Sequence, residues 1–214
     1  GKLIKTFEIE NWPGIKHVNG SQLAYDIYEQ AMALGTSYLY EKVAALEIEG
    51  AERRVRCESG AEFTAPAVII ATGTVERLLN IPGEQEMIGR GISFCAVCDA
   101  AFYRNKHVII VGAGNAAFEE SLYLSEFASK VTILARRDVI SAEQITQEKV
   151  AANPKIEVLT WRVPQEVIIE NNRVAGLKVL NKQTGATETM LARGVFPYIG
   201  ADPVTDFCRD LGIT

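Results

Sequence analysis

The chain has 214 residues, of which 48% are hydrophobic and 23% charged, and its formal net charge is −5. This hydrophobic fraction suffices for one large core or two smaller ones, and it excludes disordered and collagen-like classes. An acidic chain offers no electrostatic footprint for nucleic acid or for an anionic membrane, so we expect neither as a partner. The longest apolar runs, such as residues 67–71 and 107–111, are too short to span a bilayer.

The first third of the chain predicts one helix followed by a group of strands. Apolar residues at helical spacing indicate a helix over residues 21–34, with Ser21 as its N-cap and Gly35 as its terminator. The next predicted strands are 37–40, 43–49, 52–58 and 62–64. The continuous apolar run 67–71 predicts a fully buried strand that ends at Thr72-Gly73.

The Pro- and Gly-containing stretch 78–91 predicts a crossing into a second unit with βαβ rhythm. Strands and helices alternate in this unit, and three further strands joined by short turns predict a meander. The predicted elements are strands at 107–111, 131–135 and 156–161, helices at 115–129 and 142–152, and meander strands at 166–170, 174–181 and 187–192. A last buried strand at 194–200 is expected to return to the first unit.

A glycine-rich sequence, Gly112-Ala113-Gly114-Asn115-Ala116-Ala117, directly follows the predicted strand 107–111 and opens the next helix. In that context Gly112 permits a tight turn, Gly114 lets the backbone approach a pyrophosphate, and Ala117 keeps the helix close to the sheet. The free N–H groups at the helix start favour an anion. The motif therefore predicts a dinucleotide site, with an ordinary glycine-rich βα turn as the alternative.

The end of the following strand indicates which dinucleotide binds. An NAD site usually has an acidic residue there, which binds the ribose hydroxyls. This chain has Arg136 and Arg137 instead, and two guanidinium groups suit a 2′-phosphate. We therefore expect NADPH rather than NADH, with a solvated surface pair of arginines as the alternative.

Cys95 and Cys98 form a Cys-x-x-Cys unit shortly before the strand that leads to the dinucleotide motif. Two thiols at this spacing can close a disulfide and reopen it by exchange, so the pair predicts redox chemistry. A zinc site or two inert thiols are the alternatives, although the other cysteines and histidines are isolated and do not have the spacing of metal ligands. Asp99, next to the pair, can donate a proton to a departing thiolate and take it back.

Together these residues resemble the low-molecular-weight thioredoxin reductases, flavoproteins of the pyridine nucleotide-disulfide oxidoreductase family. The resemblance extends over nearly the whole chain. It rests on residues 10–14, 71–73, 89–99, 103–106, 112–120, 122–124, 128–131, 136–138 and 194–200. It implies an α/β fold in which a Rossmann-like NAD(P)-binding domain of the three-layer ββα type is inserted in an incomplete FAD-binding domain of the same type.

The resemblance also implies domain boundaries. Residues 1–77 would form a partial FAD-binding domain, residues 78–193 the NAD(P)H-binding domain that carries the cysteine pair, and residues 194–214 a return into the FAD-binding domain. The family's glycine-rich FAD turn and its later Gly-Asp segment have no counterpart in this sequence, so we expect both ends to be cut from a longer protein. We expect the chain alone to bind FAD weakly, and any exposed apolar face to belong to the first domain.

In that family NADPH reduces FAD, FAD reduces a disulfide, and the resulting dithiol reduces thioredoxin. The resemblance implies that Cys98 faces the flavin, that Cys95 exchanges with thioredoxin, and that Asp99 is the acid-base group. The implied cofactor residues are Gly112, Gly114, Asn115, Ala117, Glu119, Arg136 and Arg137 for NADPH, and Asn11, Thr72 and Gly73 for FAD. Arg90 and Phe102 resemble the surface that the family uses with thioredoxin.

Members of the family are homodimers, so we expect a homodimer here. Four cysteines with one close pair do not form a secreted disulfide framework, which favours the cytoplasm. Ala135 and Ser141 stand where the family often has His and Arg, which leaves NADH open as the donor. The remaining alternatives are a ferredoxin- or NADH-dependent flavin thioredoxin reductase, the flavoprotein subunit of a peroxide-reducing system, and a catalytically inactive dinucleotide-binding fragment.

Overall fold

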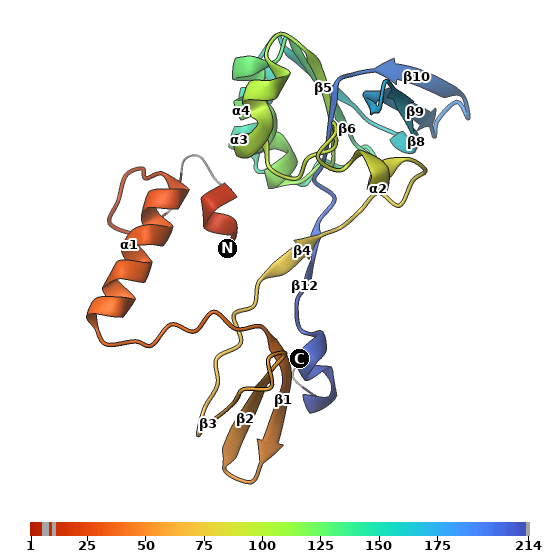
Figure 1. The fold of residues 1–214 in the computed structure, drawn as a ribbon. Helices are drawn as coiled ribbons and strands as arrows, with labels where there is room; N and C mark the ends of the chain where they lie inside the picture. Colours follow the sequence, from red (N-terminus) through yellow and green to blue (C-terminus); the bar gives the residue numbers. More distant parts are fainter. Residues whose placement is uncertain (6–8, 10–11, 213–214) are drawn as a thin grey trace. The chain divides into compact units, whose positions relative to one another are not determined.

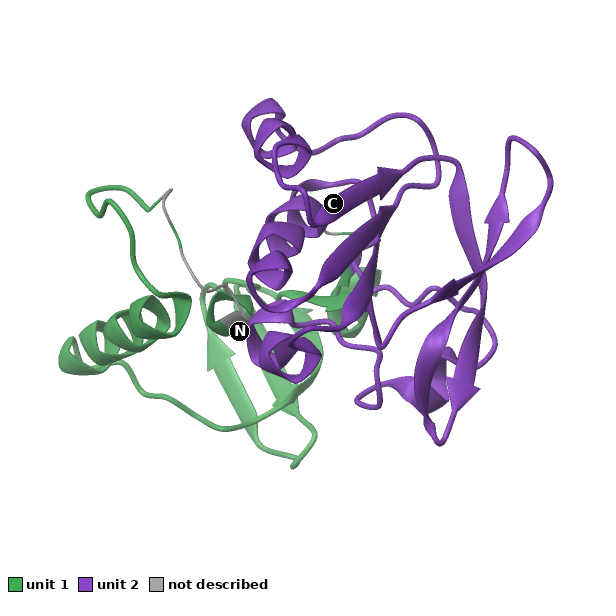
Figure 2. Cartoon of the chain, turned by 90° about the horizontal axis from the view of Figure 1, so that it is seen from above, with its two compact units in different colours: residues 1–75, 202–214 green, residues 76–201 purple. Residues whose placement is uncertain are grey.

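The structure is a computed structural model that describes residues 1–5, 9 and 12–212 (Figure 1). The chain divides into two compact units, which Figure 2 shows in different colours. Unit 1 comprises residues 1–75 and 202–214, and unit 2 comprises residues 76–201. Strands β4 (Thr74–Glu76) and β12 (Ala201–Pro203) pair with each other. Both points at which the chain passes from one unit to the other, 75/76 and 201/202, lie in these two strands.

Unit 2 is built on a parallel sheet of four strands in the order β11-β5-β6-β7. These strands are β5 (His107–Val111), β6 (Lys130–Leu134), β7 (Ile156–Leu159) and β11 (Gly194–Pro197). Side chains of a strand point alternately to the two faces of its sheet. Strand β5 is apolar at nearly every position because both of its faces are covered, as is typical of a parallel sheet.

Helices cover one face of this sheet, and an antiparallel meander covers the other (Figure 1). Val108 and Ile110 of β5 pack with Phe118 of helix α4, whereas Ile109 belongs to a second core together with Val167 of the meander. The helical elements of unit 2 are α2 (Glu84–Met87), α3 (Ala96–Asp99), η2 (Ala100–Tyr103), α4 (Asn115–Phe127) and α5 (Gln144–Ala151), and the meander strands are β8 (Arg162–Glu170), β9 (Arg173–Asn181) and β10 (Thr187–Leu191). These three layers confirm the predicted fold class.

Strand β11 lies in a different unit from the one predicted for it. We expected residues 194–200 to return to the first unit, but Gly194–Pro197 pairs in parallel with Val108–Val111 inside the unit 2 sheet. Val195 and Phe196 are fully buried, one in each of the two cores of unit 2. Burial on both faces keeps this strand in unit 2, so the second unit extends to residue 201 rather than to residue 193.

In the described part of unit 1, the chain forms a helix and a small antiparallel sheet and no second parallel sheet. The elements of unit 1 are η1 (Lys2–Lys5), α1 (Gly20–Ala33), β1 (Val43–Glu49), β2 (Glu52–Cys57), β3 (Glu62–Ala65) and η3 (Asp206–Leu211), together with most of the β4–β12 pair. The three strands pair in the order β1-β2-β3. The helix begins one residue earlier than predicted because Asn19, not Ser21, is its N-cap: the Asn19 side chain accepts a hydrogen bond from the Ser21 N–H.

Two predicted strands of unit 1 are wrong. Residues 37–40 and 67–71 form no strand, because a strand requires a partner for its backbone groups and the described residues supply none to these segments. The run 67–71 is not buried either, and the Ile69 side chain is 93% exposed. Ile69 and Tyr40, which is 95% exposed, are the two most exposed large apolar side chains among the described residues, and both lie in unit 1.

Candidate dinucleotide and disulfide site

The glycine-rich turn lies between β5 and α4, as the motif predicts, and Gly112 can only be a glycine. Its φ is +152°, and a Cβ on Gly112 would lie 2.2 Å from the backbone oxygen of Tyr198. Gly114 is different, since its φ is −97° and the nearest atom to a Cβ there would be Ser141 Oγ at 3.7 Å. Gly112 is therefore required by the fold, whereas Gly114 leaves open space in front of the turn.

The loop that follows β6 closes against this turn through a set of hydrogen bonds. The Ala113 carbonyl accepts from the backbone N–H groups of Ser141 and Ala142 at 2.8 and 3.1 Å. Asn115 Oδ1 accepts from the Glu143 N–H at 2.8 Å. Asn115, which the resemblance places at the nucleotide, thus has its side chain engaged in holding the 141–143 segment on the turn.

A cavity of about 650 Å³ opens in front of the glycine-rich turn. Four arginines line it: Arg77, Arg136, Arg137 and Arg162. The cavity has the volume of a small-molecule site, and guanidinium groups bind phosphate oxygens through directed N–H donors. The other lining residues are Leu79, Val111, Gly112, Ala113, Gly114, Leu134, Val139, Ser141, Val163, Pro164, Tyr198, Ile199 and Gly200.

The predicted nucleotide residues therefore divide into two groups. Gly112, Gly114 and the Arg136–Arg137 pair line the cavity, and both arginine side chains are exposed to solvent. The remaining three do not line it: Asn115, Ala117 and Glu119. Ala117 is fully buried, and its Cβ would lie 3.1 Å from a Cβ at Gly112, so a small residue is needed for the helix to approach the turn.

The residues predicted for FAD do not form a comparable site. Thr72 Oγ1 donates to the Val204 carbonyl at 2.6 Å, and the Val204 N–H donates to the Gly73 carbonyl at 3.0 Å, so both residues connect segments of unit 1. Asn11 lies outside the described residues. Among the residues that the structure describes, unit 1 has no parallel strand, glycine-rich turn and helix in succession that would cradle a pyrophosphate.

Several lining residues were not assigned to the nucleotide site from the sequence, among them Arg77, Arg162 and Tyr198. Tyr198 belongs to the run 194–200 that carries the resemblance but had no predicted role at the nucleotide, and all three come from segments far from the glycine-rich turn in sequence. Arg162 begins β8 and forms an ion pair with Glu188 at 2.6 Å, which orients it at the cavity wall. Long-range chain topology, rather than sequence pattern, brings these residues to the site.

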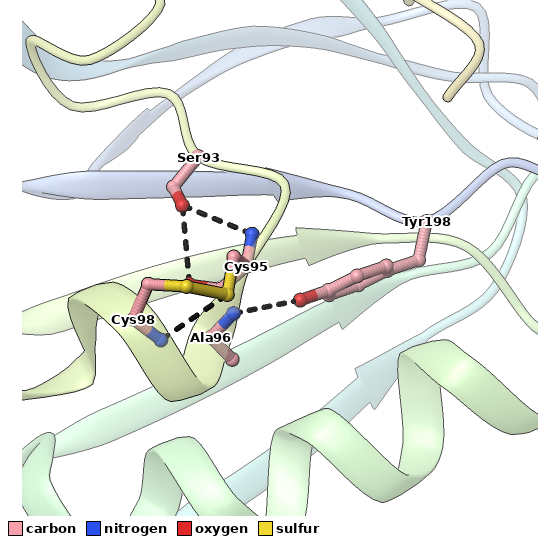
Figure 3. Close-up of a disulfide and its surroundings, with 5 residues drawn as sticks. All are labelled: Ser93, Cys95, Ala96, Cys98 and Tyr198. Carbon is pink, nitrogen blue, oxygen red and sulfur yellow. Dashed lines mark hydrogen bonds between the residues drawn. A yellow bond between two sulfur atoms is a disulfide. The ribbon is translucent and has the colours of Figure 1, made fainter. Parts of the chain in front are cut away.

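Cys95 and Cys98 form a disulfide on the helical side of unit 2, where Cys95 is the N-cap of α3 and Cys98 lies within that helix (Figure 3). Cys98 is exposed and Cys95 is half-buried. Cys95 Sγ accepts a hydrogen bond from the Cys98 N–H at 3.2 Å. Ser93 Oγ accepts from the Cys95 N–H at 3.1 Å and fixes the start of the loop. An N–H directed at Cys95 Sγ would stabilise a thiolate there once the disulfide opens.

Asp99 lies at the end of α3 and borders a second pocket of about 210 Å³. Its own N–H donates to the Cys95 carbonyl at 3.2 Å. Four cations line the same pocket: Arg90, Lys106, Arg173 and Arg193. Phe102, also in the lining, is 70% exposed. A positive, partly apolar surface thus lies beside the carboxylate that follows the cysteine pair.

Glu120 of α4 gives a testable pH dependence of stability. Burial, and to a lesser degree the Glu119 carboxylate, raises the pKa of Glu120 from its ordinary 4.5 to about 7. The folded state therefore favours the protonated carboxyl, and the stabilisation that this provides is complete below pH 4.5 and is lost as the pH rises through 7. We expect Glu120→Gln, which cannot ionise, to raise the free energy of unfolding by about 2 kcal/mol at pH 8.

Urea unfolding of the two proteins at pH 4.5 and pH 8 measures this effect. Glu126→Gln is the matched control, because Glu126 is an exposed glutamate on the same helix and does not contribute to the pKa shift of Glu120. An equal gain from Glu120→Gln at both pH values would contradict a half-buried carboxyl that titrates near neutrality.

A Rossmann-type unit that carries both a glycine-rich phosphate turn and a Cys-x-x-Cys disulfide is the arrangement of a pyridine nucleotide-linked oxidoreductase. The comparisons with known proteins agree. Residues 6–214 match the pyridine nucleotide-disulphide oxidoreductase family, and the chain belongs to it. Among the described residues, no helix is long and apolar enough to cross a membrane.

Relatives within this family indicate which kind of oxidoreductase the chain is similar to. The thioredoxin reductase of Bacillus subtilis (strain 168) is 38% identical over the whole chain, which spans 67% of that protein. The bifunctional thioredoxin reductase/thioredoxin of Mycobacterium leprae (strain TN) is 38% identical over 99% of the chain, which spans 46% of that protein. The crystal structure of Lactococcus lactis thioredoxin reductase in the FR conformation superposes with a TM-score of 0.95 at 39% identity, covering all of this chain and 70% of that one.

Proposed function

We propose that the chain acts in an NADPH-dependent thioredoxin-disulfide reductase, in which electrons pass from NADPH through FAD to the Cys95–Cys98 disulfide and on to thioredoxin. The observation that carries the proposal is a Cys-x-x-Cys disulfide within the same compact unit as an arginine-lined dinucleotide cavity. The family membership implies a flavin and a pyridine nucleotide. When bound, these cofactors would supply two electrons.

At the disulfide, the proposal assigns a role to each of three residues. In the dithiol, the Cys95 thiolate attacks a sulfur of the partner's disulfide, which forms a mixed disulfide and releases one partner thiolate. The Cys98 thiolate then attacks Cys95 Sγ, so that the Cys95–Cys98 bond re-forms and the partner leaves as a dithiol. Asp99 holds the proton that a departing thiolate takes up. The Cys98 N–H directed at Cys95 Sγ supports Cys95 as the attacking thiolate.

At the nucleotide, the glycine-rich turn would hold the pyrophosphate, and Arg136 and Arg137 would bind the 2′-phosphate. We expect Arg136→Ala or Arg137→Ala to lower the affinity for NADPH about tenfold, because each removes a charge-assisted hydrogen bond. The affinity for NADH, which has no 2′-phosphate, is expected to stay within about twofold. Calorimetric titration of both nucleotides measures this difference.

Arg209→Ala serves as the matched control for that titration, since Arg209 is an exposed arginine of unit 1 and pairs with Asp206. It should leave both affinities unchanged. Equal losses for NADPH and NADH in the Arg136 and Arg137 variants would contradict recognition of a 2′-phosphate and would favour NADH, or a donor other than a nicotinamide, as the alternative.

The proposed partner is thioredoxin or a thioredoxin-like protein. Arg90 and Phe102 border the pocket next to Asp99, and the exposed Phe102 ring gives a partner an apolar contact close to the disulfide. The M. leprae relative, whose name joins thioredoxin reductase and thioredoxin, supports this choice. The proposal also includes a homodimer and a cytoplasmic location, with no role for nucleic acid or a membrane.

One assay separates the proposed function from its alternatives. The protein is supplied with excess FAD and with NADPH, NADH or reduced ferredoxin, and the dithiols formed on thioredoxin are counted. We expect NADPH to support turnover and the other donors to support little. Turnover with ferredoxin alone would identify the ferredoxin-dependent reductase, and nucleotide binding without turnover from any donor would identify an inactive dinucleotide-binding fragment.

A further inference from the structure

Tyr198 contacts both the glycine-rich turn and the disulfide loop. It follows directly after β11, and its backbone N–H donates to the Val111 carbonyl at 2.7 Å. Its backbone oxygen faces Gly112 so closely that a Cβ there would lie 2.2 Å away. Tyr198 also lines the dinucleotide cavity. Its main chain therefore forms part of the wall against which a bound nucleotide would rest.

The side chain of Tyr198 extends in the other direction, to the disulfide loop (Figure 3). Its hydroxyl oxygen accepts a hydrogen bond from the Ala96 N–H at 3.1 Å. Ala96 is fully buried and follows Cys95 directly, so this bond satisfies a backbone donor that water does not reach. A buried N–H left without a partner is destabilising, which gives the contact a consequence for the loop.

The surroundings keep this hydroxyl in place and uncharged. The Tyr198 ring packs against the core cluster that contains Phe118 and Ala96. Burial, with the Glu120 carboxylate adding to it, raises the pKa of Tyr198 far above its ordinary value. The phenol is therefore protonated at neutral pH, and its oxygen accepts the hydrogen bond from the Ala96 N–H.

We infer that Tyr198 is a positioning residue through which occupancy of the dinucleotide cavity alters the reactivity of the Cys95–Cys98 disulfide. The inference rests on the proposed function, since it takes the cavity to bind a dinucleotide. A nucleotide seated against the Gly112–Tyr198 wall restricts the Tyr198 backbone. The restriction passes through the ring and its hydroxyl to the Ala96 N–H, and thereby holds the loop that carries Cys95.

The rate of disulfide reduction by dithiothreitol tests this inference on the whole chain. In that reaction the two thiols of dithiothreitol become a cyclic disulfide while Cys95 and Cys98 become two thiols, which are counted with a thiol reagent. NADP⁺ is the probe, because it is already oxidised and supplies no electrons. We expect saturating NADP⁺ to slow the reduction about threefold in the unmodified protein, by holding the loop closed.

Tyr198→Phe keeps the ring and removes only the hydroxyl. We expect reduction to be about fivefold faster without nucleotide, because the Ala96 N–H loses its partner, and to become independent of NADP⁺. Amide hydrogen exchange at Ala96 should accelerate in the same variant, whereas binding of NADP⁺, measured by calorimetry, should persist. Tyr103→Phe is the matched control, since the Tyr103 ring lies in the same core cluster, packed edge-on against Phe196, and it should keep the response to NADP⁺.

The outcomes separate this inference from the proposed function. Saturable binding of NADP⁺ that leaves the reduction rate of the unmodified protein unchanged would overturn the coupling and leave the dinucleotide site intact. A Tyr198→Phe protein that responds to NADP⁺ like the unmodified one would also overturn it. A chain that binds no NADP⁺ at all would overturn the dinucleotide site, and the coupling with it.

Discussion

Replacing Cys98 by serine is expected to lower the turnover of thioredoxin about a thousandfold and to turn the protein into a covalent trap for its partner. Cys95 in this variant can still attack the partner's disulfide, and the N–H of residue 98 still points to Cys95 Sγ. The second thiolate, which resolves the mixed disulfide, is missing. A partner-sized adduct should therefore accumulate and disappear on treatment with dithiothreitol, which mass spectrometry under non-reducing conditions detects.

Cys95→Ser distinguishes the roles of the two sulfurs. Turnover should fall by a similar factor, but no adduct should form, because the attacking thiolate is absent. Cys208→Ser is the control, since Cys208 is a buried free thiol of unit 1 and should keep normal turnover. An adduct on Cys95→Ser rather than on Cys98→Ser would show that the two cysteines have the opposite roles. Undiminished turnover in either variant would show that the cysteine pair has no redox role in the reaction.

Gly112→Ala has the second largest expected effect, and it should act on folding and binding together. The new methyl group would lie 2.2 Å from the Tyr198 oxygen, on a residue whose φ of +152° disfavours a side chain. We expect unit 2 to lose about 3 kcal/mol of unfolding free energy and the chain to lose measurable binding of NADPH. Urea unfolding and calorimetric titration of the same preparation measure the two effects.

Gly114→Ala is the matched variant for the same turn. Its φ of −97° is ordinary for alanine, and the closest atom to the added Cβ is Ser141 Oγ at 3.7 Å. Stability should therefore stay within about 0.5 kcal/mol of the unmodified protein. Affinity for NADPH should still fall about tenfold or more, because the methyl group occupies the space that a phosphate needs. Unchanged NADPH affinity in Gly114→Ala would show that no nucleotide approaches this backbone.

The fold of unit 2 could be predicted from the sequence because its local signals agree with one another. The apolar strand His107–Val111, the glycine-rich turn and the helix that follows form one βα unit with the predicted start points. The return of β11 to the sheet could not be predicted in the same way. Pairing of Gly194–Pro197 with a strand more than eighty residues earlier depends on chain topology, which a local pattern does not encode.

In unit 1, by contrast, a local sequence pattern predicted a strand that does not form. The run 67–71 has the composition of a buried strand, but composition cannot supply the neighbouring strand that would accept its hydrogen bonds. Similarly, the motif predicted the cavity residues Gly112, Gly114 and the arginine pair, which are local in sequence. Tyr198 and Arg162 line the same cavity but come from distant segments, so they could be identified only from the three-dimensional structure.

In the proposed reaction, Cys95 and Cys98 receive the electrons that the pyridine nucleotide delivers. NADPH is added without oxygen to the protein in the presence of excess FAD, free thiols are alkylated, and the peptide that carries both cysteines is weighed by mass spectrometry. We expect two alkyl groups on that peptide, and none before NADPH is added. A peptide that keeps its disulfide while the flavin becomes reduced would show that the cysteine pair does not receive these electrons.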